Sequence, residues 1–501
     1  MAHPADPSND ASDDASDDSG AAGLGDDPLG LRAEAPLLDG WLAFRRSSTV
    51  PFGTPGHKQR TDLVGPVVEG DIPLYGGVDT IRQSAGAIAQ ADRLLARAWG
   101  ADWGRISVGG STHGNQTLML ALCRPGDSVV VTRTLHRSLL LGMVLAGVTP
   151  VWVRPDVDPV TGLPTHVPVE RVEAALSAHP EAKAVFLVEP TYVGTVSDVA
   201  AHAEVAHRHD VPLVVDQAWG AYFGFHPDLP RHALQAGADA MVTSAHKTLP
   251  AYTQAAYVVA NTGRIDRDRL DRAFEATATT SPSGTIAASG DAARALMERD
   301  GERLLAHLLR IVDHARDLLR EVPGVVLLDD VVASDVIVDR AKLAINISAT
   351  GASGLAVEED LVARGMPVEL ADLDTVVPII SVNDDIASVE AFVHGVRDSI
   401  ARNRAEPREV RPSISWTVEP DVVMSPRDAY FAGHRTVAAS DAIGSVSAEL
   451  VAPYPPGIPV LAPGERVTEA AVEGLRMVMS HGTQVRYAAD PSLQTLQVVA
   501  G

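Results

Sequence analysis

The chain has 501 residues, of which 46% are hydrophobic, and carries a formal net charge of −24. The length corresponds to about three domain-sized units, and the acidic balance argues against broad contact with nucleic acid or an anionic membrane, so a small-molecule partner is expected. The single cysteine, Cys123, excludes an internal disulfide and a cysteine zinc site. This usage fits a reducing compartment, the cytoplasm.

The N-terminal residues differ in composition from the rest of the chain. Residues 1–31 are predicted to be a disordered acidic tail, because residues 1–30 hold eight aspartates and neither lysine nor arginine. Neither a secretory signal nor an apolar run long enough to cross a membrane is recognised. Residues 32–75 are predicted to form a helix and an irregular arm, from the helical spacing in LRAEAPLLDGWLAF and the Pro and Gly of PFGTPGHKQR.

Residues 76–265 alternate apolar strand-like runs with helical ones, which predicts an α/β large domain with a mainly parallel, seven-stranded sheet. The predicted strands are residues 105–108, 128–132, 150–154, 184–189, 212–216, 240–244 and 255–260. Helices are predicted at Gly114–Leu122, Arg137–Ala146, Pro168–Ala178 and Asp198–His209.

Residues 266–410 and 411–501 are predicted to form two smaller units. Long amphipathic runs follow Asp266, so residues 266–410 are predicted to hold connecting helices and a small α+β domain. Residues 411–501 are predicted to be a C-terminal α+β domain.

The segments that carry chemistry follow three of the predicted strands. Lys247 comes directly after AMVTS, Asp216 closes PLVVD, and the stretch VGGSTHGNQ follows RISV and opens a helix. Ligands of parallel sheets bind beyond the carboxyl ends of the strands. The three segments are therefore expected to face one crevice.

Together these segments supply what pyridoxal phosphate (PLP) needs from a protein. PLP requires an amine that holds its aldehyde as a Schiff base, an acid that keeps its ring nitrogen protonated, and donors for its phosphate. Lys247 is the candidate amine and Asp216 the candidate acid. A helix N-terminus attracts an anion, and glycines 109, 110 and 114 would let the backbone approach it closely. The candidate phosphate ligands are Ser111, Thr112, Ser244 and His246.

Other residues complete the candidate site. His136, after the second strand, would stack on the ring or move protons, and small Ala218 and Gly220 would leave room for a planar ring beside Asp216. His113 is included as a cofactor-binding neighbour. No metal site is predicted, because the histidines at 202, 207 and 209 lack the i, i+4 spacing of a helical zinc pair.

Each motif also has an ordinary structural interpretation. A lysine after a strand is usually a solvated surface residue, and a lone histidine is more often structural. Asp216 could cap a helix, and GGSTH could be a strand-to-helix turn with a Ser or Thr cap. The convergence of the three strand ends favours the cofactor site.

The chain also resembles the prokaryotic ornithine/lysine/arginine decarboxylase family, in its short form without the extra N-terminal domain. This family has fold type I of the PLP enzymes, the aspartate aminotransferase-like fold. The resemblance runs from about Arg32 to the C-terminus through motifs in the family's order. They are APLLDGW, TPGHK, GGSTHGN, LCRPGD, LHRS, PTYVGTVSD, VDQAWG, SAHKTLPAYTQ, TSPS, AIGSVSAE and YPPGIPVLAPGE.

The resemblance implies roles for individual residues. Lys247 would bind the cofactor covalently, Asp216 would pair with its pyridine nitrogen, and His136 would stack on its ring. These three are the expected catalytic residues. The resemblance also implies an active site at a subunit interface, and hence a homodimer or a larger even assembly.

The implied activity is decarboxylation of lysine, ornithine or arginine to a diamine or polyamine precursor and CO2. A carboxylate should receive the distal cation of the substrate, for which Glu449 and Glu465 are candidates. Three segments depart from the family pattern: GDIPLYGGVDTIRQSAGAI has no glutamate after Asp71, DQAW replaces D-E-A-H, and TPGHKQR lacks paired glycines. Transamination, oxidative deamination and a non-catalytic scaffold of the same fold therefore stay open as alternatives.

Overall fold

The computed structural model describes residues 27–46, 55, 57–58, 60–72, 86–454 and 457–500. Residues 1–26 of the predicted tail lie outside the described residues. The same holds for residues 73–85 of the altered GDIPLYGG segment, for three residues of TPGHKQR and for the two prolines after Tyr454. Within the described residues, no helix combines the length and apolar character that crossing a membrane requires.

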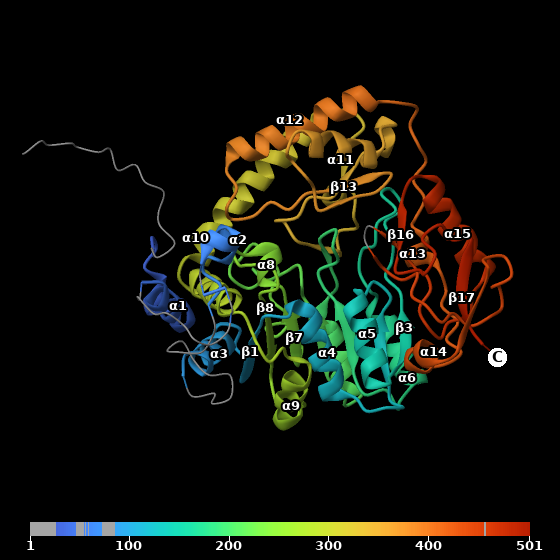
Figure 1. Ribbon diagram of the computed structural model, residues 1–501. Coiled ribbons are helices and arrows are strands. Elements are labelled where there is room, and N and C mark those ends of the chain that lie inside the picture. Colours follow the sequence, from blue (N-terminus) through green and yellow to red (C-terminus); the bar gives the residue numbers. More distant parts are fainter. Residues whose placement is uncertain are drawn as a thin grey trace, which may run out of the picture.

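A seven-stranded sheet forms the centre of the large domain, in the order β1-β8-β7-β6-β4-β2-β3 (Figure 1). Strands β2, β3, β4, β6 and β7 run parallel, whereas β8 is antiparallel to both of its neighbours. The prediction of a mainly parallel, seven-stranded sheet is therefore confirmed. The strands span Trp103–Ser107 (β1), Ser128–Thr132 (β2), Thr149–Val153 (β3), Val185–Val188 (β4), Leu213–Asp216 (β6), Ala240–Thr243 (β7) and Ala256–Ala260 (β8).

Both faces of the sheet are covered, which explains why its strands read as continuous apolar runs. Successive residues of one strand enter different cores: Val130 packs in the cluster with α6 and α7, and Val129 and Val131 pack in the cluster with α4, α5 and α9. The helices are Gly110–Leu122 (α4), Arg137–Ala146 (α5), Val169–Ala178 (α6), Val199–Arg208 (α7) and Arg267–Thr277 (α9).

Helix α4 begins at Gly110, earlier than the predicted Gly114. Its N-cap is Gly109, and no side chain caps the helix. The first turn therefore consists of Gly110, Ser111 and Thr112, with the two hydroxyl groups free of a capping role. Gly110 has a φ of 69°, a left-handed conformation that favours glycine.

A long helix, Gly284–Arg320 (α10), leads from the large domain to a small domain. The small domain contains a four-stranded sheet in the order β12-β13-β11-β9. The strands are Val326–Leu327 (β9), Ile345–Asn346 (β11), Leu370–Ala371 (β12) and Thr375–Val377 (β13). Helices Gly354–Ala363 (α11) and Ile386–Asn403 (α12) lie at the outer side of this domain (Figure 1).

The C-terminal part forms a third unit beside the large domain, drawn in red in Figure 1. Helix Glu469–Ser480 (α15) and two two-stranded sheets enclose a separate apolar core. The sheets pair His434–Ala438 (β14) with Thr495–Val499 (β17), and Ala452–Tyr454 (β15) with Gln484–Arg486 (β16). Arg133 of the large domain and Glu465 of this unit form a buried ion pair between them.

Candidate active site

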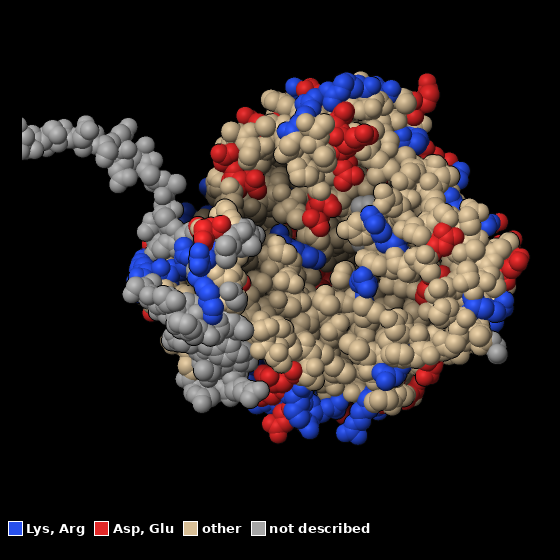
Figure 2. Space-filling view, viewed as in Figure 1, with Lys and Arg blue, Asp and Glu red and all other residues tan. Residues whose placement is uncertain are grey.

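A cavity of about 420 Å³ opens at the carboxyl ends of β6 and β7. The large domain supplies most of its lining, the small domain adds Glu369, Leu370 and Val377, and the C-terminal unit adds Tyr454 and Ile458. Figure 2 shows the surface hollowed between these parts. Three parts of the chain thus contribute to one site.

Asp216 ends β6 with its carboxyl group buried in this cavity. The side-chain amide of Asn115 donates a hydrogen bond of 2.7 Å to Oδ2, and the backbone N–H of Ala218 donates one of 3.1 Å to Oδ1. Burial raises the pKa of Asp216, whereas Asn115 and the charge of Lys247 oppose the rise. The carboxyl group is therefore fixed in direction.

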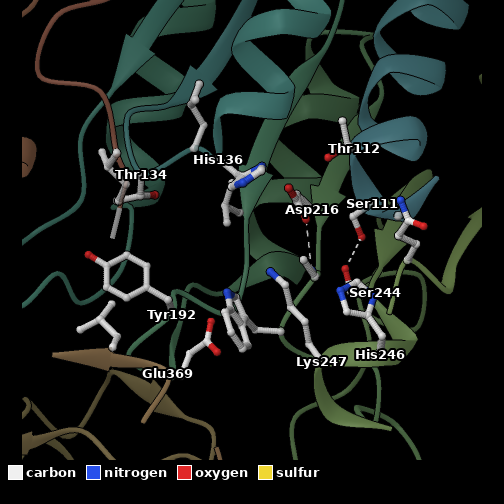
Figure 3. Close-up of a pocket in the computed structure, with 18 of the residues that line it drawn as sticks. Ser111, Thr112, Thr134, His136, Tyr192, Asp216, Ser244, His246, Lys247 and Glu369 are labelled. Carbon is white, nitrogen blue, oxygen red and sulfur yellow. Dashed lines mark hydrogen bonds between the residues drawn. The ribbon is translucent and has the colours of Figure 1, made fainter. Parts of the chain in front are cut away.

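Lys247 lies in Ala245–Thr248 (α8), the single helical turn that follows β7. Its side chain points into the cavity toward His136 and Asp216 (Figure 3), and its Nζ lies 4.0 Å from the ring centroid of Trp219. No carboxylate of the described residues lies within ion-pair distance of it. Burial lowers the pKa of Lys247 against the charges of Asp216 and Glu369, which favours the uncharged amine that a Schiff base requires.

Hydroxyl groups also line the cavity. Ser111 in the first turn of α4 and Ser244 after β7 form a hydrogen bond of 2.7 Å between their Oγ atoms (Figure 3). Thr112 and His246 line the cavity beside them. Three hydroxyls, a helix N-terminus and an imidazole form a donor set that suits a phosphate.

His136 is the N-cap residue of α5, and its ring also faces the cavity. Its Nδ1 lies 2.9 Å from Oγ of Ser138 and accepts the backbone N–H of that residue. Burial, Lys247 and Arg137 lower the pKa of His136 to about 4, so the ring is neutral at neutral pH. A neutral ring can stack on an aromatic cofactor without the cost of burying a charge.

Three of the predicted contributions do not reach the cavity. The ring of His113 turns away from it, with Nδ1 2.8 Å from Oγ of Ser107 and Nε2 2.9 Å from the carbonyl of Phe274. Gly114 serves packing rather than ligand approach, since a Cβ there would lie 2.3 Å from Cγ2 of Val242. Gly220 likewise makes room for Phe223.

The proposed carboxylates for the substrate cation also lie elsewhere. Glu465 is paired with Arg133, and Glu449 accepts backbone N–H groups of Ala489 and Gln497. Glu369 of the small domain lines the cavity instead.

Sequence reasoning missed Asn115, which holds Asp216, and two residues that line the cavity, Glu369 and Tyr192. Asn115 belongs to the motif VGGSTHGNQ, about one helical turn after Ser111. Its position in that motif could therefore have marked it as a residue of the site. Nothing local marked Glu369, which reaches the site only through packing of the small domain on the large one.

Comparison with known proteins places the chain in a family. Residues 35–343 match the family model described as the major domain of Orn/Lys/Arg decarboxylase, and residues 413–485 match the C-terminal domain of the same enzymes. The chain belongs to the Orn/Lys/Arg decarboxylase family. The resemblance seen in the sequence motifs is thereby confirmed.

Relatives match over nearly their whole length. An arginine decarboxylase of Halalkalibacterium halodurans is 32% identical over 93% of this chain and 98% of its own. An arginine decarboxylase of Bacillus subtilis is 31% identical with the same coverage.

Solved structures show the fold. A lysine decarboxylase of Francisella novicida superposes with a TM-score of 0.80 at 18% identity, covering 93% of this chain and 81% of that one. The constitutive lysine decarboxylase of E. coli gives 0.77 at 21% identity, with coverage of 93% and 82%. The expected fold class is confirmed.

Proposed function

We propose that this protein is a PLP-dependent decarboxylase of a basic L-amino acid, releasing CO2 and a diamine or polyamine precursor. The observation that carries the proposal is the placement of the Lys247 amine and the Asp216 carboxyl group on one cavity. Membership of the decarboxylase family supports it.

The residues of the cavity fit the cofactor part by part. Lys247 would hold the aldehyde, and Asp216, fixed by Asn115, would face the pyridine nitrogen. Ser111, Thr112, Ser244 and His246 would bind the phosphate, while His136 and Ala218 would flank the ring. When bound, PLP withdraws electrons from the bond to be broken at Cα of the substrate.

The protein's own contribution is to orient the substrate and to control protons. Burial raises the pKa of Asp216, and the hydrogen bond from Asn115 and the charge of Lys247 oppose that rise, so both favour the charged carboxylate that would face the ring nitrogen. Burial lowers the pKa of the half-buried Lys247, so its amine gives up a proton more readily than that of an exposed lysine. This amine would hold the cofactor and could move a proton at Cα of the substrate. Which Cα bond breaks depends on how the substrate is held.

Glu369 is the residue that we assign to the distal cation of the substrate. It faces Lys247 across the cavity (Figure 3), and its charge raises the pKa of that lysine. A carboxylate in this position would bind a guanidinium or ammonium group by a charge-assisted hydrogen bond. Two relatives are named arginine decarboxylases, which agrees with a substrate whose side chain is cationic.

The experiment that tests the function supplies PLP with L-arginine, L-lysine and L-ornithine in turn and measures CO2 and the mass of the amine product. One substrate should yield CO2 and its amine in equal amounts. Lys247→Ala should lose both the product and the absorbance of covalently bound PLP, and Glu369→Gln should raise KM more than it lowers kcat. If the PLP band is present and all three substrates give ammonia, peroxide or a keto acid without CO2, the proposal is wrong.

Assembly and location are separate parts of the proposal. The family resemblance favours a homodimer or a larger even assembly, with an amino acid as the small-molecule partner, and location in the cytoplasm. Light scattering of the full chain tests the assembly, and a monomer that retains full activity would contradict it.

A further inference from the structure

A second lysine, Lys342 of the small domain, touches the same indole as Lys247. Its side chain is only 6% exposed, and its Nζ lies 3.9 Å from the ring centroid of Trp219. Lys247 Nζ lies 4.0 Å from that centroid. Because both distances end at one ring, the two ammonium groups are close enough to interact.

The backbone around Lys342 is firmly anchored. Its N–H donates to the carbonyl of Asp339 at 3.0 Å, and its carbonyl accepts Nη2 of Arg316 at 2.8 Å. Gly194 packs against it so closely that a Cβ there would lie 2.6 Å from Cβ of Lys342. The backbone that carries this side chain is thus fixed beside the cavity.

The ammonium group lacks an ion-pair partner. Within the described part of the chain no carboxylate lies within 4.0 Å of its Nζ, and the charged groups that act on it are Asp339 on its own turn, Glu369, and Lys247. Burial, with the charge of Lys247, lowers the pKa of Lys342 to about 8. A buried, unpaired ammonium group is costly to fold, so stability alone does not account for it.

We propose that Lys342 is a positioning residue for substrate affinity: its positive charge competes with the distal cation of the substrate for the field of Glu369. This inference rests on the proposed function, since it takes the substrate to be cationic. Binding of that cation and protonation of Lys342 oppose each other, and by linkage the effect is reciprocal. A cationic ligand should therefore expel a proton from Lys342 and bind more tightly as pH rises through about 8.

Steady-state kinetics separates the charge of Lys342 from its bulk. KM for the accepted substrate is measured from pH 7 to 9 in the holoenzyme, in Lys342→Met, and in Lys342→Arg, which stays charged throughout. The substrate amine titrates equally in all three, so the ratios of KM isolate position 342. The wild-type KM should match that of the arginine variant at pH 7 and approach that of the methionine variant at pH 9, a relative change of about fivefold.

A binding experiment provides a readout without turnover. Borohydride fixes the cofactor on Lys247, and 1,5-diaminopentane is titrated calorimetrically at pH 8 in two buffers of different ionisation enthalpy. The wild type should release a fraction of a proton on binding, and both variants should release none. Lack of CO2 production with proton release intact would contradict the proposed decarboxylation, but would still show that Lys342 opposes a cation bound in this cavity.

Two results would overturn the inference. One is a wild-type KM that runs parallel to that of Lys342→Arg across the whole pH range, and the other is proton release that is equal in the wild type and the variants. Lys342→Gln serves as a second neutral variant. If both neutral variants fail to fold, Lys342 is a structural residue and the inference is wrong.

Discussion

The side-chain amide of Asn115 connects Asp216 to His136 through one chain of hydrogen bonds. It donates to Oδ2 of Asp216 at 2.7 Å and to Oγ of Ser138 at 2.8 Å, and that hydroxyl lies 2.9 Å from Nδ1 of His136. The acid that would face the pyridine nitrogen and the imidazole that would flank the ring are therefore positioned by the same residue of α4.

Replacing Asn115 by leucine should weaken cofactor binding. The variant removes a hydrogen bond to a charged group, worth about 1.5–3 kcal/mol, and raises the pKa of Asp216 further. We expect the Kd of PLP, followed by absorbance, to rise at least about tenfold. Gln116→Leu, next on the helix but lining a different cavity, should bind PLP as the wild type does. Equal PLP affinity in both variants would refute the role of Asn115.

Adding a methyl group at Gly114 should destabilise the large domain. Its Cβ would lie 2.3 Å from Cγ2 of Val242 and 2.8 Å from Cγ2 of Val258, so α4 must move away from the sheet. Overpacking of this kind costs about 1–3 kcal/mol, measurable by urea denaturation. Gly263→Ala is the matched control, because no atom lies within 4 Å of its Cβ. A Gly114→Ala protein as stable as that control would contradict the packing argument.

The pair Arg133–Glu465 should tie the C-terminal unit to the large domain. Both side chains are buried, and Nη2 lies 2.9 Å from Oε2. Glu465→Gln leaves the guanidinium without its counter-charge and should lower the free energy of unfolding by about 3–5 kcal/mol.

The control for this prediction is the exposed pair of Arg466 with Asp421, whose atoms lie 2.8 Å apart. Arg466→Ala should cost less than about 1 kcal/mol, because solvent screens the pair. Similar losses in the two variants would show that burial of the Arg133 pair has no special effect.

Glu189 should make stability depend on pH. Burial raises its pKa from 4.5 to about 8, against hydrogen bonds from Ser197. The unfolded chain loses this proton above its ordinary pKa, whereas the folded protein keeps it until about pH 8. The free energy of unfolding therefore falls as pH rises across this window, by at most about 1.4 kcal/mol per pH unit.

Glu189→Gln should remove this contribution. The Tm of the variant minus the Tm of the wild type should therefore increase between pH 5 and pH 8. Exposed Glu181 offers the control, since Glu181→Gln should track the wild type over the same range. A constant difference in Tm between Glu189→Gln and the wild type would exclude the raised pKa.

The positions of the strands along the chain and the place of the chemistry follow from local sequence. Predicted strands match the observed ones closely because buried parallel strands are short apolar runs. The sequence alone could predict that Lys247 and Asp216 line one cavity, since the carboxyl ends of parallel strands share one edge. The start of α4 was missed because glycine, serine and threonine are common in turns.

The sequence by itself determined the strands, the lysine and the acid, because each depends on neighbours within a few residues along the chain. Only the tertiary structure decided that Glu369 rather than Glu449 or Glu465 lines the cavity, that His113 faces away from it, and that Lys342 shares an indole with Lys247. Those relationships include contacts between distant parts of the chain, such as that of Lys342 with Trp219, which are 123 positions apart. They depend on how the small and C-terminal domains pack on the sheet, which no local pattern encodes.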